Sequence, residues 1–183
     1  MSFGAYASMR PLVVGPGMKT GLNIALDNPA TMGSDLVVGA AAALAIHDPP
    51  LIIIDMGTAT TMTVIDREAR VLGGAIIPGV GISLEALANG TSQLPHISLD
   101  APKKCISTDT VEAMRSGSVY GTAAMLDGMI ERMEAELGEP AAVIATGGLG
   151  GCIIPYCRRE ITYDKNLLLN GLWALYQKNK RKR

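Results

Sequence analysis

The hydrophobic pattern is strongest in the middle of the chain. The run Leu51-Ile-Ile-Ile54 is continuous and aliphatic and ends in Asp55, and the polar and apolar residues that follow it reach Asp66. A short apolar run bounded by a turn is typical of a buried strand, and Gly57 permits a turn that a side chain would obstruct. The pattern predicts a strand, a tight turn and a return strand over residues 51–66, with a carboxylate at the tip of the first strand.

Apolar blocks on both sides of this hairpin predict further elements. Before it, a short strand is expected at 11–15, followed by a turn, and a helix opens near Asn28 and runs to about His47. After it, residues 71–79 form a third strand behind a turn at 66–70, which makes an antiparallel meander.

The second half of the chain predicts mainly helices. The expected elements are a helix at 82–88 with a left-handed cap at Gly90, a surface loop at 92–106, a long helix from the cap Asp109 to Leu137 with Gly138 as its stop, a strand at 141–146 entering a glycine-rich loop, and an amphipathic helix at 166–178.

Composition narrows the class of protein. The 183 residues are 48% hydrophobic and 18% charged, with a net charge of −1, which is typical of a globular chain and offers no basic excess for nucleic acid. The longest apolar run, at 37–46, is too short to span a bilayer, and the N-terminus lacks the pattern of a secretory signal. Three cysteines without C-x-x-C spacing favour reduced thiols in the cytoplasm over a zinc site.

Asp55 and Asp35 are the candidate chemical groups. Asp55 stands beside Thr58, Thr60 and Thr61, so the hairpin could hold phosphate with hydroxyls and amides while the carboxylate holds a cation. An ordinary hairpin with threonines chosen for strand propensity is the alternative. Asp35 falls in the first helical turn, where the helix dipole favours the ionised carboxylate; it is either a proton acceptor or simply a first-turn acid.

Four other segments have a functional and a structural interpretation. The run Gly15-Pro-Gly-Met-Lys-Thr20 lacks the glycine that a P-loop requires before its lysine, so a turn is preferred. Glycines at 147–151 either admit a ligand or serve the topology. Small residues at 117–123 in the long helix allow a neighbour to approach closely, in the core or at a subunit interface. The basic residues at 178–183 favour a solvated tail over a nucleic-acid arm.

Several motifs, taken in order, resemble type III pantothenate kinases. The resemblance rests on Asn28-Pro29 through Gly33-Ser-Asp35, Asp55-Met-Gly-Thr-Ala-Thr-Thr61, Gly73-Gly-Ala-Ile-Ile-Pro-Gly79, Ser83-Leu-Glu-Ala-Leu87, Leu94-Pro95, Thr110-Val-Glu-Ala-Met114 with Ser116-Gly117, and Ala145-Thr-Gly-Gly148. It implies a mixed α/β chain with the actin-like, ribonuclease-H-like ATPase fold, a homodimer, and transfer of the ATP γ-phosphoryl group to pantothenate in coenzyme A synthesis.

The resemblance also implies roles for individual residues. Asp35 would be the base that faces the pantothenate hydroxyl, and Gly33, Ser34, Asp35 and Leu36 would lie along that substrate. Thr110 would contact pantothenate and Thr58 would contact ATP, which acts with Mg²⁺. Asp55 would bind a monovalent cation, K⁺ or NH₄⁺.

This sequence departs from the family pattern in three places. Leu36 replaces an arginine that could hold an anionic group, and Thr63 replaces an aspartate. The family's opening D-x-G-N-T-N hairpin has no counterpart, so we expect residues 1–47 to be a remnant of the N-terminal lobe with its linking helix, and 48–183 to be the C-terminal lobe. The missing lobe could be supplied in trans. Two other functions are alternatives to a pantothenate kinase. One is a non-catalytic Baf-type regulator, and the other, less favoured, is a sugar or acetate kinase of the same superfamily.

Overall fold

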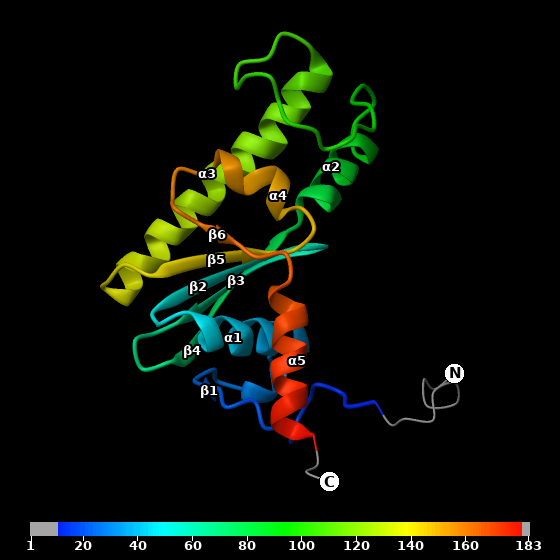
Figure 1. The fold of residues 1–183 in the computed structure, drawn as a ribbon. Coiled ribbons are helices and arrows are strands. Elements are labelled where there is room, and N and C mark those ends of the chain that lie inside the picture. The colour runs from blue at the N-terminus through cyan, green and yellow to red at the C-terminus, as the bar shows by residue number, and fades with distance from the viewer. Residues whose placement is uncertain (1–10, 181–183) are drawn as a thin grey trace.

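The computed structural model describes residues 11–180, and its centre is one six-stranded sheet (Figure 1). The strands lie in the order β1-β4-β3-β2-β5-β6, and their bounds are β1 Asn23–Ile24, β2 Leu51–Met56, β3 Ala59–Ile65, β4 Arg70–Pro78, β5 Ala142–Thr146 and β6 Thr162–Tyr163. The helices are α1 Ser34–Ile46, α2 Val80–Asn89, α3 Thr110–Leu137, α4 Gly150–Ile153 and α5 Leu167–Asn179, with short 3₁₀ turns at Pro29–Thr31 and Ile154–Tyr156.

The predicted meander is confirmed, and it sets the register of the sheet. β2 and β3 pair antiparallel from Leu51 opposite Ile65 to Met56 opposite Thr60, and β3 pairs antiparallel with β4. β5 returns after the long helix and pairs parallel with β2. β2 therefore lies between two neighbours in the middle of the sheet, which explains why it is almost continuously apolar.

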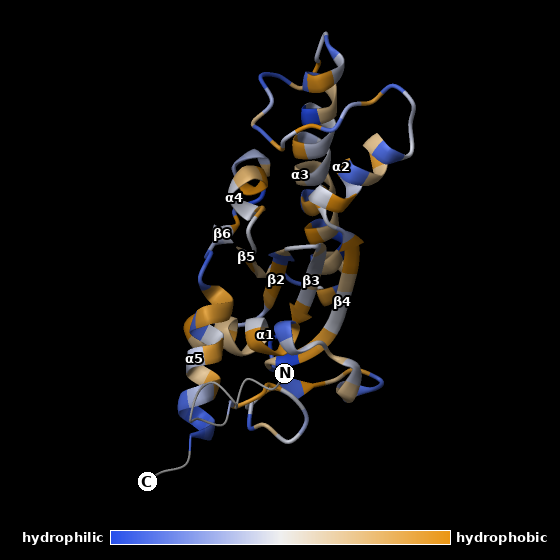
Figure 2. Ribbon diagram, turned by 90° about the vertical axis from the view of Figure 1, so that its right-hand side faces the viewer, coloured by the Kyte–Doolittle hydropathy of each residue, from blue (hydrophilic) through white to orange (hydrophobic). Residues whose placement is uncertain are grey.

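Helices cover both faces of the sheet, and each face has its own core. Ile52, Ile54 and Met56 point to the face that α2, α3 and α4 cover, whereas Leu51 and Ile53 point to α1 and α5 (Figure 1). Hydrophilic residues gather at the lower end of α5 (Figure 2). This arrangement leaves the ends of β2, β3 and β5 as the open part of the sheet centre.

Two helix ends follow the predicted capping chemistry and one does not. Asp109 caps α3 by accepting from the Glu112 N–H at 2.9 Å, and Gly138 ends it with φ +77°. Gly90 was expected to be left-handed, but this prediction is wrong: its φ is −85°, and its N–H still bonds to the Ala86 carbonyl as in a helix.

The N-terminal part of the described chain differs from the prediction. Residues 11–15 were predicted as a strand but form none, while the short strand Asn23–Ile24 pairs parallel with β4. The helix near Asn28 is split into a 3₁₀ turn and α1, with Asp35 in the first turn of α1 as expected. The end of the basic tail, 181–183, lies outside the described residues. Within 11–180 no helix is long and apolar enough to cross a membrane.

Candidate active site

Asp55 lies at the end of β2 with a threonine on each side. In the strand register it stands opposite Thr61 of β3 and Thr146 of β5. Thr146 is buried, and Asp55 itself is half-buried. The three strands therefore place one carboxylate and two hydroxyls at a single edge of the sheet.

Asp35 reaches this same edge from the helix layer. A small cavity of about 10 Å³ is bounded by both carboxylates, Asp35 and Asp55, together with Leu36, Gly39, Ile53, Thr61, Thr63, Thr146 and Leu168. Burial raises the pKa of the Asp55 carboxyl above its usual value, and the neighbouring charge of Asp35 raises it further. The structure thus brings together two acids that are twenty positions apart in the sequence.

The oxygen donors around Asp55 suit a hard cation. Carboxylate and hydroxyl oxygens are the ligands that Mg²⁺ and monovalent cations accept, and the cavity offers no sulfur or imidazole. Among residues 11–180 no group of three His, Cys, Asp or Glu side chains could hold a metal by itself. A cation at Asp55 would therefore take its remaining ligands from threonine hydroxyls, backbone carbonyls, water or phosphate.

Gly33, Ser34 and Leu36 surround Asp35 at the start of α1. A Cβ on Gly33 would lie 2.5 Å from Asp35 Oδ1, so glycine leaves the space that the carboxylate occupies. The Ser34 hydroxyl donates to the Val14 carbonyl at 3.1 Å, and Leu36 is half-buried at the cavity wall. The predicted substrate-contacting segment is therefore one short stretch of backbone at the mouth of the site.

Thr58 is exposed at the turn of the hairpin, where the chain reverses between β2 and β3. The Gly57 N–H donates to the Ala59 carbonyl at 3.0 Å, and the Thr58 carbonyl accepts from the Gly79 N–H at 3.2 Å. Gly79 precedes α2, so this bond ties the hairpin tip to the end of β4. Thr58 does not line the cavity between the two acids; it stands farther out at the same end of the sheet.

The glycine-rich loop after β5 packs directly on the end of β2, next to the turn of the hairpin. Gly147 has φ +94°, and a Cβ there would lie 2.6 Å from backbone atoms of Met56. The Leu149 N–H reaches the Met56 carbonyl at 3.4 Å, and the Tyr163 hydroxyl donates to the Gly147 carbonyl at 2.8 Å. At Gly147 the close approach is to the backbone of Met56 and serves the packing of the strand ends near Asp55, while binding of a ligand by this loop stays a prediction.

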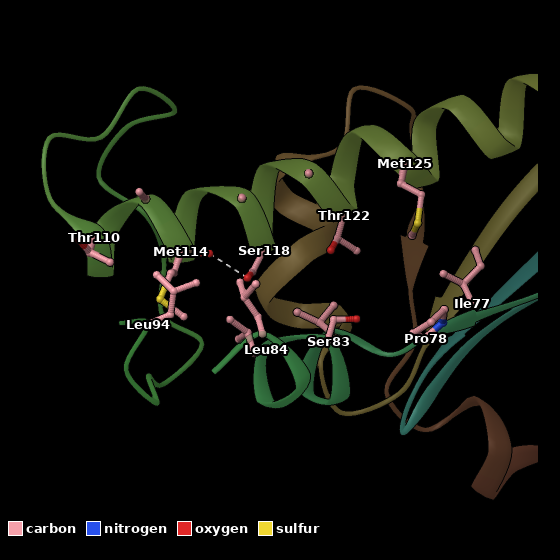
Figure 3. A pocket seen from close by; sticks show the side chains of 15 residues that line it. Ile77, Pro78, Ser83, Leu84, Leu94, Thr110, Met114, Ser118, Thr122 and Met125 are labelled. Atoms are coloured by element: carbon pink, nitrogen blue, oxygen red, sulfur yellow. Dashed lines mark hydrogen bonds between the residues drawn. The ribbon is translucent and has the colours of Figure 1, made fainter. Parts of the chain in front are cut away.

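Thr110 is not brought to Asp35. It begins α3 and lines a different, larger cavity of about 640 Å³ between α2 and α3. Figure 3 shows Thr110, Ser118 and Thr122 on α3 facing Ser83 and Leu84 on α2, with Met114 and Met125 supplying sulfur and apolar surface. The two cavities share no lining residue, so Thr110 and Asp35 do not form one site within this chain.

Sequence reasoning missed Thr146 and Leu168 as parts of the site. Thr146 ends an apolar strand just before the glycines, so its position at a strand end is the signal that could have identified it. Leu168 comes from α5, whose packing against α1 has no local sequence signal.

Comparisons with known proteins settle the family. The family model for type III pantothenate kinase matches residues 2–132. The chain belongs to the type III pantothenate kinase family. A curated type III pantothenate kinase from Exiguobacterium sp. AT1b is 47% identical over 176 residues, which cover 96% of this chain and 69% of the relative. Another from Halalkalibacterium halodurans is 42% identical, covering 95% of this chain and 68% of the relative.

A solved structure confirms the fold class. The crystal structure of a conserved Baf family protein from Campylobacter jejuni, described as a transcriptional activator, matches with a TM-score of 0.61 and 23% identity. The match covers 87% of this chain and 70% of that one. The expected actin-like fold with a mixed sheet and flanking helices is therefore confirmed, whereas the boundary between the two lobes near residue 47 stays a prediction.

Proposed function

We propose that this member of the type III pantothenate kinase family acts in the ATP-dependent phosphorylation of pantothenate to 4′-phosphopantothenate. The observation that carries the proposal is the meeting of Asp35 and Asp55 at the ends of β2, β3 and β5. One acid is exposed at a helix start and the other is half-buried among threonines, so the two are suited to different tasks.

In this proposal Asp35 is the general base. The primary hydroxyl of pantothenate lies against Gly33, Ser34 and Leu36, its oxygen attacks the γ-phosphorus of ATP, its proton passes to the Asp35 carboxylate, and ADP leaves. Proton removal by a positioned carboxylate contributes roughly 10²–10⁴ in rate. Gly33 fits this role because any side chain there would displace Asp35.

Asp55 is the proposed cation ligand. A bound Mg²⁺ or monovalent cation, K⁺ or NH₄⁺, would offset the charge of the ATP phosphates. Asp55, Thr61 and Thr146 supply the oxygen donors, and Thr58 lies where it could contact ATP at the hairpin tip.

The cavity between α2 and α3 supports the homodimer. The cavity is mostly apolar, and Gly117 and Gly121 lie in its wall. A Cβ added to either glycine would meet no other atom within 4 Å. We propose that a second copy covers this surface and that Thr110 contacts pantothenate within the dimer. The mass of the purified chain in sedimentation velocity tests this: a monomer at micromolar concentration contradicts it.

The decisive experiment is a coupled assay for ADP release with pantothenate, ATP, Mg²⁺ and K⁺. The variant Asp35→Asn removes the base, while Asp48→Asn changes an exposed acid just beyond α1 as the matched control. We expect D35N to lose about 100-fold or more in kcat and D48N to keep wild-type activity. Release only after adding a chain with the D-x-G-N-T-N hairpin supports complementation in trans, whereas no release in either case favours a non-catalytic regulator.

A further inference from the structure

The end of α5 is joined by hydrogen bonds to a loop 160 residues away. The Lys19 N–H donates to Asn179 Oδ1 at 2.9 Å, and Asn179 Nδ2 donates back to the Lys19 carbonyl at 2.9 Å. Asn179 Nδ2 also donates to the Leu175 carbonyl of its own helix at 2.9 Å. The side-chain amide therefore binds both the N–H and the carbonyl of Lys19, which belong to two successive peptide units of the loop.

A second contact strengthens this connection. Lys178 Nζ donates to the Thr20 carbonyl at 2.9 Å, so consecutive residues of α5 hold consecutive residues of the loop. The next residue, Gly21, has φ +82°, and a Cβ on it would lie 2.1 Å from Lys178 Nζ. Glycine at position 21 therefore leaves room for the ammonium group of Lys178. Figure 1 shows the blue N-terminal segment beside the lower end of α5.

The same loop holds the start of the helix that carries Asp35. The Val14 carbonyl accepts from the Ser34 hydroxyl at 3.1 Å, and Ser34 is the first residue of α1. The N-cap residue, Gly33, has no side chain with which to cap the helix. The bond from Ser34 to the loop satisfies none of the free N–H groups of the first turn, but it ties the first residue of α1 to residue 14 of the loop.

We infer that Asn179, acting through loop 14–20 and Ser34, is a positioning residue for the Asp35 carboxylate. This inference rests on the proposed function of Asp35. α5 already lies across α1, with Gly171 so close to the Val38 carbonyl that a Cβ would be 2.5 Å from it. The helix pair supplies a rigid body, and Asn179 extends that rigidity to the loop and hence to the start of α1.

Limited trypsin digestion tests the first step without any need for catalysis. Lys19 is a tryptic site whose backbone Asn179 holds, whereas Lys103 and Lys104 lie in a distant exposed loop and serve as internal controls. We expect Asn179→Ala to speed cleavage after Lys19 several-fold and to leave cleavage at 103–104 unchanged. The matched control is Asn170→Ala, the same truncation at an exposed position of α5. Equal cleavage in both variants would overturn the inference.

The second step is tested at the two carboxylates. Carbon-13 NMR titration follows Asp55, whose midpoint is sensitive to the charge of Asp35. We expect Asn179→Ala to lower that midpoint part of the way to its value in Asp35→Asn, because Asp35 moves away, and we expect Asn170→Ala to leave it unchanged. A midpoint identical to wild type in N179A would show that Asn179 does not position Asp35, whether or not the chain is an active kinase.

Kinetics complete the test and separate it from the proposed function. We expect Asn179→Ala and Ser34→Ala each to lower kcat for pantothenate roughly tenfold, with KM for ATP unchanged, since a small displacement of the base slows the chemical step. Because both act through one loop, the double variant should be no slower than either single one. Additive losses would contradict a shared path, while absence of activity in the wild-type chain would refute only the proposed function.

Discussion

Gly147 offers a sharp test of how the site is held together. Replacing it with alanine adds one methyl group at φ +94°, 2.6 Å from the backbone N, C and O atoms of Met56. Holding an L-residue in left-handed space costs about 1–2 kcal/mol, and overpacking against backbone costs about 1–3 kcal/mol more. The expected loss in the free energy of unfolding is therefore about 2–5 kcal/mol.

This loss should be easy to measure. For a domain of this size, 1 kcal/mol corresponds to about 2–4 °C in Tm, so G147A should melt roughly 4–20 °C below wild type. Urea unfolding followed by far-UV circular dichroism gives the free energy directly. The control is Gly148→Ala, since a Cβ at Gly148 meets nothing within 4 Å, and its effect should stay within about 0.5 kcal/mol.

The result that would refute the reasoning is equal stability of the two variants. It would mean that the loop after β5 moves away from Met56 without loss, so the bond from Tyr163 to the Gly147 carbonyl and the contact of Leu149 with Met56 contribute nothing. The packing of the strand ends around Asp55 would then not depend on Gly147.

Two further predictions concern charge and thiols. Because the pKa of Asp55 is raised in the folded state, its contribution to stability is present below the usual carboxyl pKa and is lost as pH rises through the folded-state pKa. Asp55→Asn should therefore raise Tm at pH 7 relative to wild type, and the difference in Tm should shrink on acidification. A difference in Tm that does not depend on pH would contradict this. The Cys105 and Cys152 thiols are exposed, whereas burial and, to a smaller extent, the charge of Asp127 raise the pKa of Cys157 to about 12. A thiol reagent at pH 8 should therefore label Cys105 and Cys152 quickly and Cys157 only on unfolding. Rapid labelling of all three cysteines would contradict this.

The sequence predicted the elements that local patterns control. The hairpin at 51–66, the third strand and the long helix with its Asp109 cap follow from short-range periodicity and capping chemistry, and all are present. The failures lie where local rules compete with longer-range contacts. The strand Asn23–Ile24 forms through its pairing with β4. Two residues are too few to show the alternating pattern that predicts a strand.

The candidate site was predicted in part for the same reason. Asp35 and Asp55 could each be identified from position, one at a helix start and one at a strand end, but their proximity depends on α1 lying across the sheet. The separation of Thr110 from that pair could not be read from motif order. The contact of Asn179 with Lys19 could not be predicted either, because it joins residues 160 positions apart and because any exposed asparagine can form such hydrogen bonds.

The energetics of the two acids indicate why they stand together. Burial and a neighbouring like charge both disfavour the ionised form of Asp55, so the pair opposes folding at neutral pH. Packing does not require it, because the surrounding wall of Leu36, Ile53 and Leu168 would accept an apolar side chain. A cation bound by the Asp55 and threonine oxygens would remove the repulsion and leave Asp35 free to accept a proton. The arrangement opposes the stability of the fold and fits the cation site that we propose at Asp55.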